Sequence, residues 1–185
     1  LKEMMKAVVA GSTVEDIQEE IDQIAGNYQN KTSQVFTKAN DDDLDASEST
    51  AATTFRGTVN LVDSTKGTIQ TTDKVTGNTD FDDTLVVNVT SDSTHKLLDL
   101  NGDLPTVSDI EKLIVNNGSA NVSGTLDGVN FGNSVSITGT GDVNLNVTGD
   151  LEHLSVSSAT KGDVAIDVSS ALGSYTGGNA GESVT

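Results

Sequence analysis

Short runs in which valine, isoleucine or leucine alternates with serine, threonine, asparagine or aspartate fill most of the chain after about residue 32. Alternation with a period of two places every second side chain on one face of a strand, so each run predicts a strand with one buried face. The clearest runs are 84–89, 112–116, 134–138, 142–147, 154–157 and 163–168. Turns rich in glycine and asparagine separate them, which predicts a mainly β, repetitive domain over residues 32–185.

The inward positions of these runs are aliphatic, and the whole chain has only 4 Phe, 2 Tyr and no Trp. Such small side chains suit a narrow core, either in a parallel β-solenoid (β-helix) or in an antiparallel β-sandwich. Val135, Val143, Leu154 and Val164 recur every eight to eleven residues, a spacing that both folds can produce. The solenoid is the favoured prediction, because two-residue hairpin turns are few and outward polar side chains can form ladders between coils.

The first 31 residues carry a different, helical pattern. Ser12 or Thr13 can cap a helix, with Glu15 completing a capping box, and Gly26 can end it. The apolar side chains that share one face of this helix are Val14, Ile17, Ile21 and Ile24. Residues 1–31 are therefore predicted to form a short α-helical element that ends a preceding helical domain or caps the β domain, which we expect to continue beyond this sequence.

The charge balance excludes several classes of function. With 28 Asp and Glu against 10 Lys and Arg, the net charge of −18 would repel nucleic acid, whose binding needs clustered cations. The absence of Cys excludes disulfides, thiolate metal sites and cysteine nucleophiles. The longest apolar stretch near the start, residues 7–10, is too short to cross a bilayer, so membrane insertion is not expected.

Calcium is the ligand for which suitable oxygen-bearing side chains are most abundant. Two acidic groups are candidate metal sites, and each is equally compatible with a solvated loop. They are Asp80, Asp82 and Asp83, and Asp41 and Asp43 with their neighbours Asp42 and Asp45. A third candidate contains Asp99, Asn101 and Asp103, which begin like an EF-hand loop, although Leu104 and Ile110 replace its required glycine and its bidentate carboxylate.

Three stretches of the chain resemble bacterial S-layer proteins of the type I secreted kind, which are related to repeat-in-toxin (RTX) proteins. The first is the Gln-Val-Phe-Thr start at 34–37 with the acidic run 41–45 and the Phe-Arg-Gly-Thr at 55–58. The second is the segment 73–87, in which a turn containing Gly77 leads into a strand that begins Asp-Thr-Leu. The third is the segment 107–115, which contains Ile-Glu-Lys-Leu-Ile-Val and also begins a strand. In one respect the chain departs from RTX repeats, because Asn78, Thr79 and Phe81 stand where their glycines would be.

This resemblance implies an extracellular protein on the bacterial cell surface that binds calcium and forms a lattice with copies of itself. A surface polysaccharide is a further partner that it suggests. A structural component of such a layer is thus the leading expectation. An adhesin segment that binds a host or matrix ligand is the alternative, and a carbohydrate-active solenoid enzyme is a third. No enzymatic activity is expected, since His95 and His153 are isolated and no Gly-x-Ser-x-Gly motif occurs.

Overall fold

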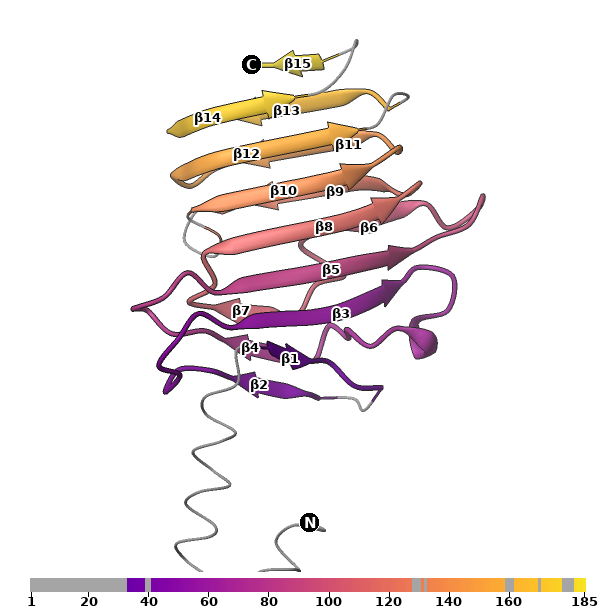
Figure 1. Cartoon of the computed structure of the whole chain (residues 1–185). Coiled ribbons are helices and arrows are strands. Elements are labelled where there is room, and N and C mark those ends of the chain that lie inside the picture. The colour runs from indigo at the N-terminus through magenta and orange to yellow at the C-terminus, as the bar shows by residue number, and fades with distance from the viewer. Residues whose placement is uncertain are drawn as a thin grey trace, which may run out of the picture.

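The chain forms a stack of parallel β-strands, as the ribbon of the computed structural model shows (Figure 1). The structure describes residues 33–38, 41–127, 131, 133–158, 162–169, 171–177 and 182–185. The expected helical element at 1–31 lies outside these residues. All strand pairs among the described residues are parallel, so the predicted β-solenoid is confirmed and the antiparallel sandwich is excluded.

The strands of the described residues belong to three sheets. The seven-stranded sheet contains, in spatial order, β1 (Ser33–Val35), β3 (Thr54–Asn60), β5 (Thr84–Thr90), β8 (Lys112–Gly118), β10 (Ser134–Gly139), β12 (Leu151–Ser158) and β14 (Leu172–Gly177). The five-stranded sheet contains β15 (Glu182–Val184), β13 (Val164–Val168), β11 (Val143–Val147), β9 (Asn121–Leu126) and β6 (Leu97–Asp99). The three-stranded sheet contains β2 (Asp43–Asp45), β4 (Lys74–Thr76) and β7 (Thr106–Ser108).

The cross-section of the stack changes partway along its length. The early coils run between the seven-stranded and three-stranded sheets, and later coils run between the seven-stranded and five-stranded sheets (Figure 1). The coil that starts with β5 supplies a strand to all three sheets. Thr54 pairs with Thr84, 30 residues later, whereas Lys112 pairs with Ser134, 22 residues later. The eight-to-eleven-residue spacing in the sequence is therefore the step between opposite sheets, and a full coil takes about two such steps.

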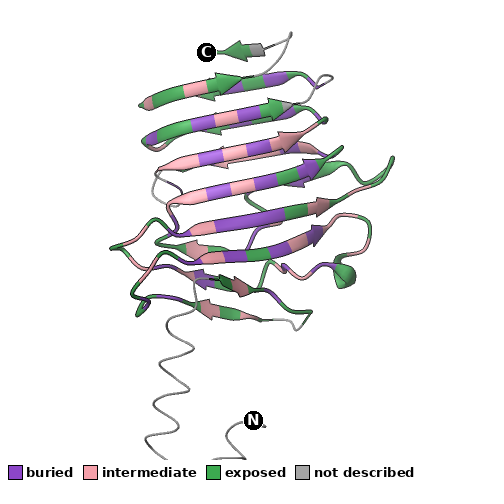
Figure 2. Cartoon of the chain, in the orientation of Figure 1, coloured by how far each residue is buried: buried purple, intermediate pink, exposed green. Residues whose placement is uncertain are grey.

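Apolar side chains, most of them aliphatic, fill the interior in columns that run from coil to coil. One column on the seven-stranded sheet comprises Phe55, Leu85, Leu113, Val135 and Leu154, each at most 1% exposed. A facing column on the five-stranded sheet comprises Leu98, Val122, Val143 and Val164. Buried and more exposed residues alternate along the strands (Figure 2). The period-two pattern of the sequence thus produces one continuous apolar core.

Polar side chains on the outer face of the seven-stranded sheet connect successive coils. Asn116 Nδ2 donates to Asn88 Oδ1 at 2.9 Å, and Thr138 Oγ1 donates to Asn116 Oδ1 at 3.0 Å. These residues occupy equivalent positions on β5, β8 and β10. The expected ladder of outward polar residues between coils is confirmed at this position.

Helical structure within the described residues is limited to one 3₁₀ turn, Ser64–Lys66, in the loop after β3. Asp63 caps this turn by accepting a hydrogen bond from the Thr65 backbone N–H. The described part of the chain has no helix that is both long enough and apolar enough to span a membrane.

Candidate functional site

The change in cross-section leaves two internal strand edges, and a cleft lies beside each of them. β6 is the first strand of the five-stranded sheet, so no described strand pairs with it on the side of the earlier coils. β7 is the last strand of the three-stranded sheet, so no described strand pairs with it on the side of the later coils. A cleft of about 690 Å³ includes residues of β6, and a second of about 580 Å³ includes residues of β7. We call them the β6 cleft and the β7 cleft.

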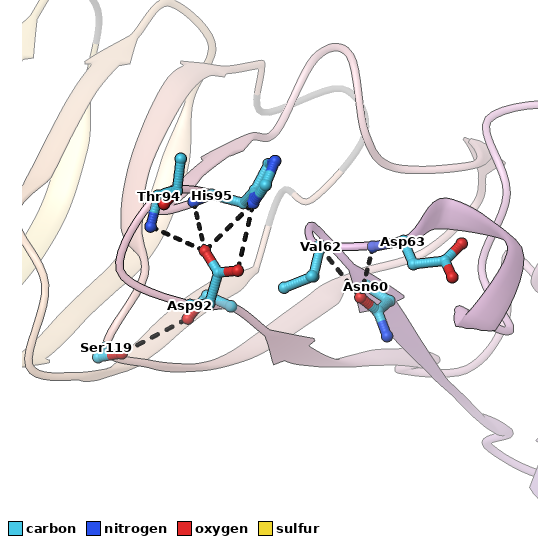
Figure 3. Close-up of polar contacts among 8 residues, drawn as sticks. Asn60, Val62, Asp63, Asp92, Thr94, His95 and Ser119 are labelled. Atoms are coloured by element: carbon cyan, nitrogen blue, oxygen red, sulfur yellow. Dashed lines mark hydrogen bonds and ion pairs between the residues drawn. The ribbon is translucent and has the colours of Figure 1, made fainter.

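One wall of the β6 cleft is the loop that follows β3. Asn60 Oδ1 accepts hydrogen bonds from the backbone N–H groups of Val62 at 3.1 Å and Asp63 at 3.0 Å (Figure 3). Gln70 Nε2 closes the other part of the loop by donating to the Ser64 carbonyl at 3.0 Å. These bonds between side chains and the backbone hold the wall in a defined shape.

The opposite wall is the turn that leads into β6. Asp92 Oδ1 accepts hydrogen bonds from the backbone N–H groups of Thr94 at 2.8 Å and His95 at 2.7 Å, and His95 Nδ1 lies 3.1 Å from the same oxygen (Figure 3). Hydrogen bonds from the His95 and Thr94 backbone, together with the nearby imidazole, lower the pKa of the Asp92 carboxyl. Asp92 therefore remains ionised and organises this turn over most of the pH range.

The β6 cleft combines apolar side chains with neutral polar ones. Val59 and Ile69 are buried beside it, whereas Val62 is 43% exposed and Leu97 is 56% exposed. The neutral polar residues that line it are Asn60, Ser64, Gln70, Thr71 and Thr94. Only Lys96, His95 and Asp103 bring a titratable side chain to this lining. Such a surface suits a ligand that is partly apolar and offers hydrogen-bonding groups.

The β7 cleft also has apolar side chains in its lining, those of Leu100, Leu104, Leu126 and Phe131. Pro105 precedes β7 and has no N–H to present at this edge. The Asn101 side chain crosses to the next coil, where Oδ1 accepts from the Thr125 N–H at 2.6 Å and Nδ2 donates to the Thr125 carbonyl at 3.2 Å. This amide therefore extends the strand pairing of β6 and β9 by one side chain.

Among the three aspartates predicted as metal ligands at 80–83, Asp83 is held inside the fold by hydrogen bonds to the backbone. Its side chain is fully buried, Oδ1 accepts from the Thr53 N–H at 2.5 Å, and Oδ2 accepts from the Asn78 N–H at 2.6 Å. Thr53 belongs to the preceding coil, so the carboxylate joins two coils at a corner. Both oxygens of Asp83 are thus occupied by backbone donors.

Asp73 has the same role at another corner, and the sequence interpretation missed it. It is also fully buried, Oδ1 accepts from the Asp42 N–H at 3.0 Å, and Oδ2 accepts from the Gln70 N–H at 2.7 Å. Asp73 and Asp83 each stand directly before a strand, β4 and β5 respectively. Position in the sequence does not single them out, because Asp142 and Asp163 also stand directly before strands, β11 and β13, and are exposed.

Asp80 and Asp82 are exposed on the loop before Asp83. Asp82 Oδ2 lies 2.7 Å from Lys112 Nζ, and Asp82 Oδ1 accepts from Asn133 Nδ2 at 2.8 Å. The hydrogen bond from Lys112 lowers the pKa of the Asp82 carboxyl. Glu111 Oε2 accepts from the Asp83 N–H at 2.7 Å, and burial raises the pKa of the Glu111 carboxyl.

The remaining predicted metal ligands lie near β2 and β6. Asp41 and Asp43 are exposed, and Asp41 has a left-handed backbone with φ of 66°. Asp99 and Asp103 lie at the two ends of one turn, where the Asp99 N–H donates to Asp103 Oδ2 at 2.8 Å. Within the described ranges, no three Asp, Glu or His side chains are grouped so that they could share one metal ion. The structure brings Asp99 and Asp103 together but gives no enclosed carboxylate cage.

Both histidines are exposed, His95 on the turn before β6 and His153 on β12. His95 contacts Asp92 through Nδ1, yet no hydroxyl in the described part of the chain lies within hydrogen-bonding distance of its Nε2. His153 Nδ1 lies 2.6 Å from Ser174 Oγ on the outer face of the seven-stranded sheet. Neither pairing contains a hydroxyl, a base and an orienting carboxylate together, as nucleophilic catalysis requires.

Comparison with known proteins leaves this geometry as the main guide to function. No protein-family model matches the chain, and neither a curated protein nor a solved structure matches it.

Proposed function

We propose that the chain is a structural component of a bacterial cell-surface layer, assembled outside the cell from copies of itself with calcium between them. The observation that carries this proposal is the distribution of carboxylates over the stack. Among the residues whose burial is described, Asp73 and Asp83 are the only buried Asp or Glu side chains. All the others lie partly or fully exposed around a closed apolar core.

This distribution supports a scaffold role for two physical reasons. Parallel coils with a continuous core make a long, regular body from a repetitive sequence. Its surface carries most of a net charge of −18, so copies repel one another unless cations lie between them. Calcium accepts six to eight oxygen ligands, which two exposed acidic surfaces together can supply.

The proposed calcium ions would bridge molecules, because the described carboxylates form no enclosed site within one molecule. Asp142, Asp163 and Asp167 are exposed on or beside the five-stranded sheet and provide such a surface. Asp142 and Asp163 occupy equivalent positions in successive coils, and the Asp163 N–H donates to Asp142 Oδ1 at 3.0 Å. A non-enzymatic role is part of the proposal, and so is contact with a surface polysaccharide.

The test is the sedimentation of the full chain by analytical ultracentrifugation in calcium, in magnesium and in chelator. We expect larger species in calcium alone and their return to the starting size when chelator is added. Asp142→Asn, Asp163→Asn and Asp167→Asn together should raise the calcium concentration needed severalfold. Asn keeps Oδ1 of Asp142 as an acceptor for the Asp163 N–H, so the fold should persist.

The matched control carries the same charge change at exposed residues away from the five-stranded sheet and from the predicted metal ligands, with Glu48→Gln, Asp109→Asn and Glu152→Gln. Circular dichroism checks that both triple variants fold. A sedimentation profile that stays the same in calcium, magnesium and chelator would rule the proposal out. If the two triple variants had equal effects, the five-stranded sheet would not be the calcium-bridging surface, and non-specific charge screening would explain the assembly.

A second candidate function is an adhesin-type binding module. The β6 cleft favours it, because its walls are held by hydrogen bonds and its lining includes the exposed apolar side chains of Val62 and Leu97. Binding of a defined ligand by a monomeric chain distinguishes this function from calcium-dependent self-association.

A further inference from the structure

The hydrogen-bond directions of β6 leave one residue with an unpaired backbone. In the pairing of β6 with β9, the Asn121 N–H donates to the Lys96 carbonyl and the Leu100 N–H donates to the Ser123 carbonyl at 2.9 Å. In a parallel pair the bonding residues alternate, so Leu98 also points its N–H and C=O to β9. The N–H and C=O of Leu97 and Asp99 therefore point to the opposite edge.

Asp99 is satisfied at that edge, whereas Leu97 is not. The Asp99 N–H donates to Asp103 Oδ2 at 2.8 Å, and its carbonyl accepts from the Gly102 N–H at 3.1 Å. Among the described residues, the N–H and C=O of Leu97 have no hydrogen-bond partner. This donor and acceptor lie on the side where the preceding coil supplies no strand, and Leu97 lines the β6 cleft.

The loop after β3 explains why the edge is open. Instead of forming a strand beneath β6, the chain turns away through Asn60 and the 3₁₀ turn Ser64–Lys66. The space that a strand would occupy remains as the cleft of about 690 Å³. Val59 and Ile69 contribute a buried apolar base, and Val62 and Leu97 contribute exposed apolar walls.

From these observations, we propose that the β6 cleft binds an extended, uncharged polypeptide segment of a partner protein by strand addition to the Leu97 edge. The unpaired N–H and C=O of Leu97 can bond to a C=O and an N–H of an extended peptide that lies beside β6 as an added strand. The apolar walls select a small β-branched side chain next to that point.

Charge argues against a second copy of this chain as the occupant. A copy carries a net charge of −18 and would have to approach a surface of the same sign. The lining itself balances Lys96 against Asp103, which favours an uncharged segment. This inference does not depend on calcium or on lattice assembly.

The test uses the full chain and a capped eight-residue peptide of alternating valine with threonine or asparagine. Two further peptides carry N-methyl groups on the odd or on the even residues and so block one strand edge each. Backbone amide NMR follows the titration. We expect saturable shifts at residues 61–71 and 94–99, and a dissociation constant about tenfold weaker with at least one methylated peptide.

Leu97→Pro is the matched protein variant, since it removes the edge donor while the ladder to β9 does not use that N–H. Proline is tolerated at strand edges of this kind, and circular dichroism checks the fold. Leu97→Ala retains the donor and serves as the control for lost apolar contact. We expect Leu97→Pro to weaken peptide binding about tenfold, and more than Leu97→Ala does.

Three results would overturn the proposal. One is the absence of peptide binding at millimolar concentration, and another is equal affinity for the parent and both methylated peptides. The third is a set of concentration-dependent shifts at residues 94–99 without peptide that disappear in Leu97→Pro, which would assign the cleft to a second copy. Because none of these measurements involves calcium, failure here is distinguishable from failure of the lattice proposal.

Discussion

At the scale of single residues, the chain uses aspartate in two chemically different ways. Asp73 and Asp83 are buried and accept backbone N–H groups, whereas Asp80 and Asp82 lie at the surface. A buried carboxylate is stable only when hydrogen bonds replace its hydration, and two backbone donors per residue provide that replacement here. Neighbouring aspartates in one acidic run therefore contribute differently to stability.

Replacement of Asp83 with alanine should strongly destabilise the protein. The change leaves the buried Thr53 N–H and the partly buried Asn78 N–H without their acceptor, at a cost of about 2–5 kcal/mol. Urea unfolding followed by circular dichroism, in chelator, measures the loss. Asp80→Ala is the control from the same run and should change the free energy of unfolding by less than about 0.5 kcal/mol. Equal effects of the two variants would refute a structural role for Asp83.

Glu111→Gln should stabilise the protein at neutral pH. Burial raises the pKa of the Glu111 carboxyl in the folded state. The wild type therefore loses stability as the pH rises from the pKa of this carboxyl in the unfolded chain towards its higher pKa in the folded protein. Glutamine removes the partly buried charge and can still accept from the Asp83 N–H. The variant's advantage, below about 1 kcal/mol, should be present at pH 7.5 and shrink below about pH 4.5. Thermal melts at both pH values measure it, and lower stability of the variant at pH 7.5 would contradict this assignment.

At the scale of elements, two corners of the coils require glycine, because a side chain there would collide with the backbone of the neighbouring coil. A Cβ atom on Gly141 would lie 1.9 Å from the Ala120 carbonyl oxygen, and one on Gly162 would lie 2.2 Å from the Gly141 carbonyl oxygen. These residues directly precede Asp142 and Asp163, whose backbone N–H groups donate to side-chain oxygens of the preceding coil, Asn121 Oδ1 and Asp142 Oδ1 respectively, at 3.0 Å each. Glycine is required at these corners because successive backbones approach too closely for any Cβ atom.

Alanine at Gly141 or Gly162 should therefore destabilise the protein by about 1–3 kcal/mol, since the clash is with backbone that cannot rotate away. Gly102→Ala is the control, because its nearest neighbour would be the Asp99 side chain at 3.0 Å, which can move. Urea midpoints of the three variants give the comparison. A loss at Gly102 as large as at Gly141 would show that the corner contacts are not the cause.

At the scale of the whole molecule, a single apolar core runs through both cross-sections. The coil of β5, β6 and β7 belongs to all three sheets, and it therefore couples the early coils to the later ones. In repeat architectures each coil contacts mainly its neighbours, so stability depends on the interfaces between adjacent coils. A defect in a central coil should consequently weaken the molecule on both sides of it.

Leu113→Ala tests this coupling at the centre of the stack. Leu113 is fully buried on β8 between Leu85 and Val135, and the cavity should cost about 2–5 kcal/mol. Ile114→Ala is the matched control, because Ile114 is adjacent on the same strand and points to the outer face, where it is partly exposed. Urea unfolding compares them. Equal losses would contradict the inward and outward assignment of the two side chains.

The sequence by itself determined the strands with regular alternation and the face of each that is buried, because the period-two pattern is a local property of the chain. It predicted β5, β8, β10, β11, β12 and β13 closely, together with inward Val135, Val143, Leu154 and Val164. It did not predict β3, β9 and β14, whose runs each contain a glycine. It also missed short strands such as β6 and β7, since three residues carry too little periodicity. Likewise, composition could not separate buried Asp83 from exposed Asp82.

Only the tertiary structure decided how the coils stack and where the stack changes shape. The step from 30-residue to 22-residue coils depends on which strands pair across long sequence separations, and this step creates the Leu97 edge. Whether a backbone N–H is bonded depends on a neighbour that lies one coil away, not on nearby residues in the chain. For that physical reason the sequence could predict a solenoid, while the clefts, the buried aspartates and the open edge became visible only in three dimensions.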